Sequence, residues 1–491
     1  MRLPGYIFDE ARQTARALID FSAGLFNPTL RLGVTGLSRS GKTVFIAALI
    51  HNLLNGGRLP VFDAMAQGRI ARARLEPQPD DDVPRFDYET HLRALMEARR
   101  WPESTRRISE LRLVIEYQSE RGAARDRTLT LDIFDYPGEW LLDLPLLDKS
   151  YAEWSAETIA MSRQGARAGL AGAWHAHLAN LDASAPEDEN LAREAAALFT
   201  AYLRAARDDR VALSLLPPGR FLMPGDLDGS PALTFAPLDI PPDTSPPSGS
   251  LGAMMARRYE SYKDVVVRPF FHEHFARLDR QVVLVDALAA FNAGPEAVRE
   301  LQATLGQVLS CFRVGRQTLW SSLVRPRVDR ILFAATKADH LHHTSHDRLE
   351  NILAYMTSRA IERAKFSGAQ VDVAAVAAVR ATREATIEHA GERLPSIIGV
   401  PLAGESAGSQ IFDGETETAV FPGDLPDDPQ AVFDAAAGGF RGLATGAPGD
   451  ADYRFLRFRP PAYRTPGRSG PTLPHIRLDR ALQFLLGDHL R

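Results

Sequence analysis

The segment GLSRSGKT at residues 36–43 constrains the fold of this chain more than any other, because it fits the pattern G-x-x-x-x-G-K-[ST]. An alternating apolar run at 30–34 precedes it, and an apolar helical pattern follows at 44–54. The expected order is therefore strand, glycine turn and helix. Such a turn points successive backbone N–H groups inward, in front of the positive end of a helix dipole. The sequence predicts a phosphate-binding loop here.

The side chains of this loop have distinct expected roles. Lys42 should neutralise the β and γ phosphates of a bound nucleotide, and the Thr43 hydroxyl should ligate Mg²⁺. The glycines allow the backbone to wind tightly around the phosphates. The residues predicted to contact the nucleotide at this end are Gly36, Ser38, Arg39, Ser40, Gly41, Lys42, Thr43 and Val44.

A second motif, DYPG at 135–138, ends the apolar run at 129–134. Asp135 is predicted to hold Mg²⁺, because that cation needs a hard oxygen partner opposite the phosphates. The Gly138 amide would then approach the γ-phosphate and respond to its loss. Glu139 follows, at the position where a side chain can orient the attacking water. The other interpretation of Glu139 is a solvated loop residue, since its charge would lie near an anionic phosphate.

Three weaker signals concern metal binding. Asp286 follows the apolar run at 282–285 and is a rival for the Mg²⁺ aspartate, but it lacks the glycine sensor and suits the structural end of a strand. Thr105 precedes the strand expected at 111–117, where a switch threonine would coordinate Mg²⁺; an exposed turn is the alternative. The four histidines within 340–346 are interpreted as a polar approach to a helix, since no cysteine accompanies them.

A third motif, TKAD at 336–339, follows the strand expected at 330–335 and is a variant of the guanine-reading N-K-x-D, with threonine in place of asparagine. Its carboxylate would accept hydrogen bonds from the ring N1–H and exocyclic amine of guanine, and adenine offers neither donor. Its lysine, one of only five in the chain, would cover the purine face. The residues predicted to contact the base are Thr336, Lys337, Asp339 and, through backbone amides after the next strand, Ala377 and Ala378.

Candidate strands alternate with helical patterns, which predicts an α/β fold of the P-loop NTPase, G-domain-like kind, with a mainly parallel sheet and helices on both faces. The alternation stops after residue 138, where Ala-rich helical segments precede a Pro-rich stretch, 217–250, expected to be a flexible arm. The predicted divisions are an N-terminal helix at 1–29, the first part of the G domain at 30–138, a helical insertion at 139–276, the second part of the G domain at 277–400, and a C-terminal extension packing on the G domain at 401–491. Within the extension, a short strand is expected at 453–459 and a final helix at 478–490.

Charge and composition narrow the partners and the compartment. The 57 basic and 62 acidic side chains give a net charge of −5, so no nucleic acid partner is expected. Cys311 is the single cysteine, which suits a reducing compartment, and no apolar run is long enough to span a membrane, so a cytoplasmic protein is predicted. The apolar stripe within 6–25 is expected to cover a core, and it leaves peripheral membrane contact open.

Five segments taken together resemble the bacterial YcjX-like family of phosphate-loop proteins. They are GLSRSGKT, DYPGEW followed by LLDLPLL, VLVDAL, ATKADH and the terminal LPHIRLDRALQFLLGD, and they occur in this order over most of the chain. Residues 217–250 and 405–450 have no counterpart in the resemblance. It implies a stress-associated, cytoplasmic GTP-binding protein whose G domain is interrupted by helices, with GTP or GDP and Mg²⁺ as ligands and slow hydrolysis.

The sequence is therefore compatible with three functions. The first is a GTPase in which Lys42, Gly138 and Glu139 are catalytic and the helical insertion is a nucleotide-dependent arm for an unknown protein partner. The second is a nucleotide-gated interaction module with negligible turnover. The third is an ATP-using phosphotransferase, which would require a different base contact.

Overall fold

The computed structural model describes residues 28–37, 39–103, 105, 107–120, 126–208, 212–241, 244, 246–273, 275–310, 328–389, 391–407, 409–433, 455–463 and 472–491. The predicted N-terminal helix lies outside these residues except for its last two positions, and Ser38 and Cys311 also lie outside them.

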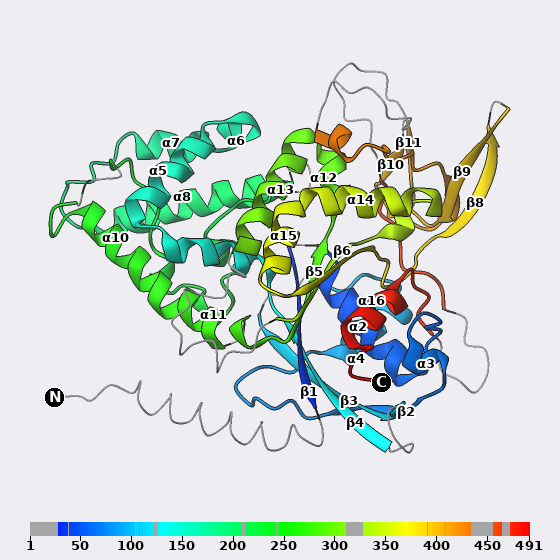
Figure 1. Cartoon of the computed structure of the whole chain (residues 1–491). Coiled ribbons are helices and arrows are strands. Elements are labelled where there is room, and N and C mark those ends of the chain that lie inside the picture. Colours follow the sequence, from blue (N-terminus) through cyan, green and yellow to red (C-terminus); the bar gives the residue numbers. More distant parts are fainter. Residues whose placement is uncertain are drawn as a thin grey trace.

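A seven-stranded sheet in the order β2-β3-β4-β1-β5-β6-β7 forms the centre of the molecule (Figure 1). Strands β4, β1, β5, β6 and β7 are parallel, and β2 and β3 extend the sheet in antiparallel pairing. The predicted mainly parallel α/β fold is confirmed. The strands are β1 (Thr29–Gly36), β2 (Ile70–Glu76), β3 (Ser109–Gln118), β4 (Asp126–Asp135), β5 (Arg280–Val285), β6 (Arg330–Ala335) and β7 (Gln370–Ala375).

The two faces of the sheet are covered by different helices because the central strands are apolar on both sides. In β5, Val282 and Leu284 enter one core, whereas Val283 and Val285 enter the other. The first core is closed by α2 (Lys42–Leu54), α4 (Tyr88–Met96) and α16 (Leu478–Leu486), with the short α3 (Asp63–Ala66) beside them. The second is closed by α12 (Ala287–Ala293), α13 (Pro295–Ser310), α14 (His346–Met356) and α15 (Ser358–Phe366).

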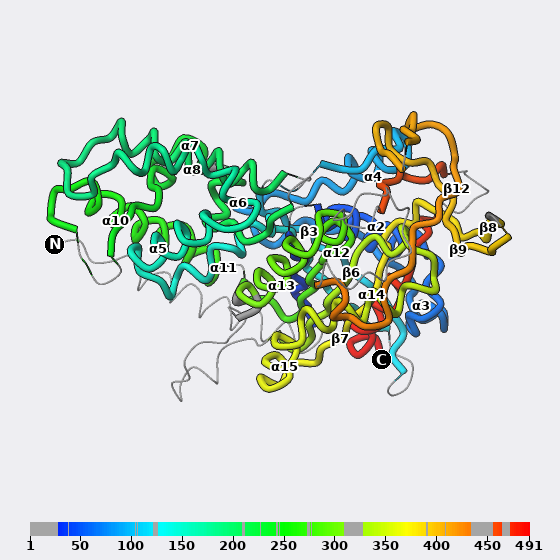
Figure 2. Tube along the Cα trace, turned by 90° about the horizontal axis from the view of Figure 1, so that it is seen from above, coloured from blue at the N-terminus to red at the C-terminus, as the bar shows by residue number. Residues whose placement is uncertain are grey.

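The insertion forms a helical lobe to one side of the sheet in both views (Figures 1 and 2). It has an aromatic core of its own, in which the Trp154 ring stacks on Tyr259 and the Trp174 ring stacks on Tyr202, with centroids 5.1 and 5.3 Å apart. Its helices are the 3-10 segment η1 (Gly138–Asp148), α5 (Tyr151–Ser162), α6 (Gly165–Leu170), α7 (Gly172–Leu178), α8 (Glu189–Arg207), α9 (Gly219–Leu222), η2 (Gly225–Leu227), η3 (Pro231–Leu233), α10 (Leu251–Tyr262), the π-helical η4 (Lys263–Val267), α11 (Arg268–Glu273) and η5 (Phe275–Arg277).

Several expectations from the sequence are corrected. The Pro-rich stretch is not a free arm where it is described, because Phe235, Ala236 and Leu238 are buried in the core of the insertion. The expected strand at 453–459 is reduced, in its described part, to one bridge between Phe458 and Pro401. The sequence did not predict the helices α3, α4 and α12. Nor did it predict β2, the small sheet of β8 (Arg383–His389), β9 (Glu392–Gly399) and β12 (Thr418–Val420), the pair β10 (Ser406–Ala407) and β11 (Gln410–Ile411), or the 3-10 turns η7 (Ala338–His340), η8 (His343–Ser345) and η9 (Pro429–Phe433).

The expected final helix at 478–490 is α16, which ends earlier, at Leu486. Its apolar residues enter the same core as α2, and the chain before it pairs with the sheet edge through Ile476 and Ala377. Among the described residues, no helix has the length and apolar character needed to cross a lipid bilayer.

Glu110 is a buried carboxyl group near the start of β3. It lies on β3 with both carboxylate oxygens buried and without a hydrogen-bond partner among the described residues. Burial, and then the negative charges of Asp132 and Asp80, raise the pKa of Glu110 from its usual 4.5 to about 7.

We expect Glu110 to make the protein less stable as pH rises from about 4.5 to about 7. In that interval the folded state holds a proton that the unfolded state has released, so the free energy of unfolding falls by up to about 3 kcal/mol. Melting temperatures measured between pH 4.5 and 8 should show a flatter profile for Glu110→Gln than for wild type. Glu116→Gln, a change of a half-buried residue on the same strand that pairs with Arg74, should leave the slope as it is; equal slopes for all three proteins would contradict the assignment.

Candidate functional site

The phosphate loop lies between β1 and α2, as its sequence predicted. Gly41 adopts the left-handed conformation (φ 87°) at the start of α2, which a residue with a side chain rarely adopts. The Lys42 ammonium is buried and donates to the backbone carbonyls of Gly36 at 2.7 Å and Leu37 at 3.4 Å. The lysine side chain therefore reaches back over the start of the loop. Ser38 lies outside the described residues.

The three residues predicted to bind metal lie together, although Thr43 comes from the start of α2, Asp135 from the end of β4 and Thr105 from a connecting segment. The Thr105 hydroxyl donates to Asp135 Oδ2 at 2.6 Å, and Thr105 Oγ1 lies 3.3 Å from Thr43 Oγ1. Burial raises the pKa of Asp135 to about 6, while Lys42 and the Thr105 hydrogen bond oppose that shift. Asp135 Oδ1 is buried without a partner in the described part of the chain. Two hydroxyls and a carboxylate form a set of hard oxygens that suits Mg²⁺.

Gly138 lies directly against the phosphate loop. A Cβ atom placed on it would come within 1.8 Å of the Gly36 carbonyl oxygen, so only glycine fits at this distance. The contact is backbone against backbone, and neither side can rotate away as a side chain could. The segment predicted to sense the γ-phosphate is therefore packed on the loop predicted to bind it.

Glu139 is buried, which excludes the solvated-loop interpretation of this residue. Its side chain is 5% exposed, and Oε1 lies 3.3 Å from Nη1 of Arg207, the last residue of α8. Its backbone is equally confined, because a Cβ atom on Gly219 would meet the Glu139 carbonyl oxygen at 1.8 Å. Gly219 in turn donates its amide to the buried Asp143 at 2.7 Å. Two segments of the insertion thus contact the residue that follows the sensor.

The base motif follows β6, and its charged side chains are already engaged by the protein. Lys337 has a left-handed backbone (φ 61°) and its ammonium pairs with Asp286. Asp286 also caps α12 by accepting from the Ala289 amide at 3.2 Å, so it serves β5 and α12 and not the metal candidates. The buried Asp339 carboxylate accepts the Ala381 amide at 2.8 Å.

Two other backbone carbonyls are engaged at the base end. Thr336 donates its hydroxyl to the Val285 carbonyl at 3.4 Å, and its contact with the base stays a prediction. The Ala377 amide donates to the Ile476 carbonyl at 3.1 Å, because the segment before α16 pairs with this edge. The predicted contact between the Ala377 amide and guanine therefore conflicts with this pairing, whereas the contact through Ala378 stays a prediction.

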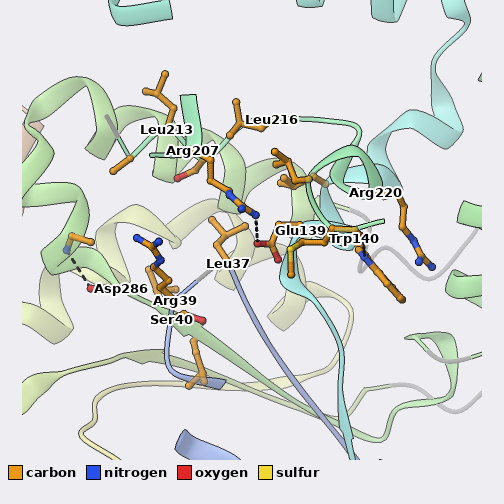
Figure 3. A pocket seen from close by; sticks show the side chains of 18 of the residues that line it. Leu37, Arg39, Ser40, Glu139, Trp140, Arg207, Leu213, Leu216, Arg220 and Asp286 are labelled. Carbon is orange, nitrogen blue, oxygen red and sulfur yellow. Dashed lines mark hydrogen bonds and ion pairs between the residues drawn. The ribbon is translucent and has the colours of Figure 1, made fainter. Parts of the chain in front are cut away.

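One cavity of about 1520 Å³ joins the two motifs that the sequence separates by almost three hundred residues. Leu37, Arg39 and Ser40 line it from the phosphate loop, and Lys337 and His340 line it from the base motif. Glu139, Trp140, Arg207 and Arg220 extend the lining toward the insertion, where Figure 3 shows Arg207 directed at Glu139. The cavity therefore borders both motifs, and Lys42, Asp135 and Asp339 are not among the residues that line it.

The four histidines after the base motif divide into two pairs. His346 Nε2 lies 2.8 Å from the Ala338 carbonyl, and the buried His340 packs against Phe458. The more exposed His342 and His343 lie beside Glu384, with one ligand atom of each residue within 4.8 Å of the others. Their ring nitrogens differ in chemistry from the hydroxyl and carboxylate oxygens around Asp135. Their exposure fits the prediction that these histidines form a polar approach to a helix.

Sequence reasoning missed Arg207 and Gly219. Neither belongs to a motif: Arg207 is one of many arginines, and Gly219 follows two prolines in a stretch interpreted as a flexible arm. A helix that ends in a basic residue is so common that it could not single out Arg207.

The comparisons with known proteins agree with one another. The sequence pattern of the YcjX-like family, DUF463, matches residues 30–490. The chain is 38% identical over 480 residues to the Ras-like GTPase YcjX of Escherichia coli (strain K12), covering 94% of this chain and 96% of that protein. It is 34% identical over 489 residues to the Ras-like GTPase YcjX of Shewanella oneidensis, covering 94% of each.

We expect Gly138→Ala to lower the free energy of unfolding by about 2 kcal/mol, because the added methyl group would overlap the Gly36 carbonyl in a packed backbone contact. Gly306→Ala is the matched control: it lies within α13 with no atom near the added Cβ, so helix propensity should raise stability by up to about 1 kcal/mol. Urea unfolding of both variants provides the measurement. A Gly138→Ala protein as stable as wild type would show that the contact is not tight.

Proposed function

The chain belongs to the YcjX-like family, and on that premise we propose that it binds GTP and GDP with Mg²⁺ and hydrolyses GTP slowly. The observation that carries the proposal is the shared cavity, which Leu37, Arg39 and Ser40 line from the phosphate loop and Lys337 lines from the TKAD motif. A nucleotide likewise has phosphates at one end and a base at the other. The names of the curated relatives, Ras-like GTPase YcjX, support the guanine nucleotide.

The phosphate end has the groups that a nucleoside triphosphate needs. Lys42 would neutralise phosphate charge from a position fixed by the carbonyls of Gly36 and Leu37. Thr43, Thr105 and Asp135 would hold Mg²⁺, which when bound offsets charge that develops on the β and γ phosphates. The buried, unpartnered Asp135 Oδ1 is the strongest support for a cation at this position, among the described residues.

Hydrolysis would depend on Gly138 and Glu139. The Gly138 amide is proposed to donate to the γ-phosphate, and Glu139 to accept from the attacking water and so fix its direction. Burial of Glu139 beside Arg207 supports this role, because the arginine offsets a carboxylate charge that would otherwise repel the phosphate. A glutamate whose negative charge is offset by Arg207 is consistent with slow hydrolysis of GTP.

Base selection would depend on Asp339, with the Lys337 stem against the purine ring. The Ala381 amide orients the Asp339 carboxylate through Oδ2. Nucleotide binding would then exchange the Lys337–Asp286 pair for contacts with the base or ribose. Base selection by Asp339 is the feature that distinguishes a GTP-binding protein from an ATP-using phosphotransferase.

The insertion is proposed to be a nucleotide-dependent arm for a protein partner. Two backbone contacts support this: Gly138 lies on the Gly36 carbonyl, and Gly219 lies on the Glu139 carbonyl. Any movement of the sensor away from the phosphate loop would therefore displace α9 and the helices packed on it. The partner would read the position of those helices.

Calorimetric titration of the purified protein tests the site. Lys42→Ala should weaken GTP binding at least about 100-fold, because uncompensated phosphate charge is costly in a buried loop. Lys365→Ala is the control, since it removes an exposed lysine on α15 and should leave GTP affinity unchanged. Equal GTP affinity in wild type and Lys42→Ala would refute the phosphate site.

The base end has its own test. Asp339→Asn should move preference from GTP toward XTP by at least about 100-fold, because an amide can donate to the second carbonyl of xanthine where the carboxylate accepted from the guanine amine. Titrations with GTP, XTP and ATP measure this preference. An unaltered preference would remove Asp339 from the site, and tighter binding of ATP than GTP by wild type would favour the phosphotransferase.

Single-turnover hydrolysis separates the GTPase from a gated module without turnover. Glu139→Gln should slow GTP cleavage about 10- to 100-fold while the affinity for a non-hydrolysable GTP analogue changes little. Glu116→Gln, which pairs with Thr128 toward the other end of β4 from the sensor, serves as the control. If wild type cleaves GTP no faster than GTP hydrolyses in solution without protein, the protein is the interaction module without turnover.

A further inference from the structure

The proposed hydrolytic site has an electrostatic problem that the G domain does not solve. Glu139 holds a buried carboxylate next to the sensor glycine, where a γ-phosphate would bring at least one more negative charge. Two anions at close range in a site of low dielectric repel each other strongly. A positive group in contact with both would remove the conflict.

Arg207 is the group in the right place. It ends α8 of the insertion, its Nη1 lies 3.3 Å from Glu139 Oε1, and it lines the same cavity as the phosphate-loop residues Leu37 and Ser40 (Figure 3). Its side chain is 33% exposed, so it is covered by protein on one side and open to the cavity on the other. The contact with Glu139 uses one terminal nitrogen of a guanidinium that carries five N–H donors.

The helix that carries Arg207 is firmly held. Phe199, Tyr202, Leu203 and Ala206 of α8 are buried in the aromatic core of the insertion, within two turns of the arginine. The C-terminal end of a helix also favours a positive charge. Arg207 is therefore presented by a rigid element and not by a loose loop, which is what a precisely placed catalytic cation requires.

Two other arginines of the cavity fit this role less well. Arg220 lies over the Trp140 ring, 3.1 Å from its centroid, and Figure 3 shows it directed away from Leu37. Arg39 belongs to the phosphate loop itself and is exposed. Arg207 is the one drawn in contact with the residue that would orient water.

Resting on the proposed GTPase function, we propose that Arg207 is a catalytic residue supplied to the G domain by its own insertion. Its guanidinium stays paired with Glu139 and donates further hydrogen bonds to γ-phosphate oxygens in the transition state. In that step the water oxygen forms a bond to the γ-phosphorus, and the bond to the bridging oxygen breaks with its electron pair left on the β-phosphate. Both protons of the water end on the released phosphate, and Arg207 keeps all of its protons.

This role also gives the insertion a chemical function. Turnover would require α8 to be docked on the sensor, so a partner that pulled the insertion away would hold the protein in its GTP-bound state. The same helix would then couple partner binding to hydrolysis.

Single-turnover kinetics with Arg207→Ala test the proposal in the full-length protein. GTP cleavage should fall at least about 100-fold, while affinity for a non-hydrolysable GTP analogue should change less than about threefold. Arg207→Lys should recover part of the rate, since it restores charge without the planar fork. Arg193→Ala removes an exposed arginine from the far end of the same helix and should match wild type.

Two further measurements distinguish contact with phosphate from a structural or purely neutralising role. GDP with aluminium fluoride, which imitates the transition state, should bind tightly to wild type and at least about 100-fold more weakly to Arg207→Ala. In a Glu139→Gln background, Arg207→Ala should still slow cleavage. If its effect vanished there, Arg207 would serve only to neutralise Glu139, and the proposed phosphate contact would be wrong.

The outcomes also separate this proposal from the one on which it rests. Wild-type cleavage of GTP that Arg207→Ala leaves intact would overturn the role of Arg207 and keep the GTPase. Tight binding of the GTP analogue by a wild type that never cleaves GTP would overturn both.

Discussion

The contact of Gly138 with the Gly36 carbonyl is the constraint on which the rest of the structure depends. It fixes the end of β4 against the phosphate loop at a distance that allows no side chain. Because β1 and β4 are neighbouring parallel strands, their ends meet at the same edge of the sheet, and the contact follows from the strand order. A second contact of the same kind, Gly219 on the Glu139 carbonyl, continues the packing into the insertion. Backbone atoms therefore connect the phosphate loop to the helical lobe in two steps.

The insertion is coupled to the G domain but does not depend on it for a core. Its aromatic cluster, built around Trp154 and Trp174, is separate from the two cores of the sheet. Arg167 of α6 adds an anchor: its guanidinium binds Glu300 of α13 through two bonds of 2.8 Å and donates to the Tyr202 hydroxyl. A lobe with its own core and a few strong contacts can keep its internal structure while its position responds to the sensor.

Each of three acidic side chains at the site lies near a basic side chain. Lys42 lies near Asp135, Arg207 contacts Glu139, and Lys337 pairs with Asp286. Asp135 ends β4, Asp286 directly follows β5 and Glu139 lies in η1, and the cation of each pair comes from a different segment of the chain. Burial makes such pairs costly to leave incomplete, because a lone buried charge loses its hydration without compensation. A nucleotide and its cation would enter a site that is already close to neutral.

Local patterns in the chain were enough to predict the phosphate loop, the aspartate–glycine motif, the base motif and the apolar strands that make a mainly parallel sheet. Each is set within about ten residues, by periodicity or by the types of side chain that phosphate and Mg²⁺ require. Which distant residues meet depends on the packing of the folded chain. Nothing local marked Gly219 in a proline-rich stretch or Arg207 among the many arginines of the chain, and the pairing of Ala377 with Ile476 depends on a segment a hundred residues later. These contacts depend on how separate elements pack, and the energy of packing is a property of both partners, so neither segment reveals it alone.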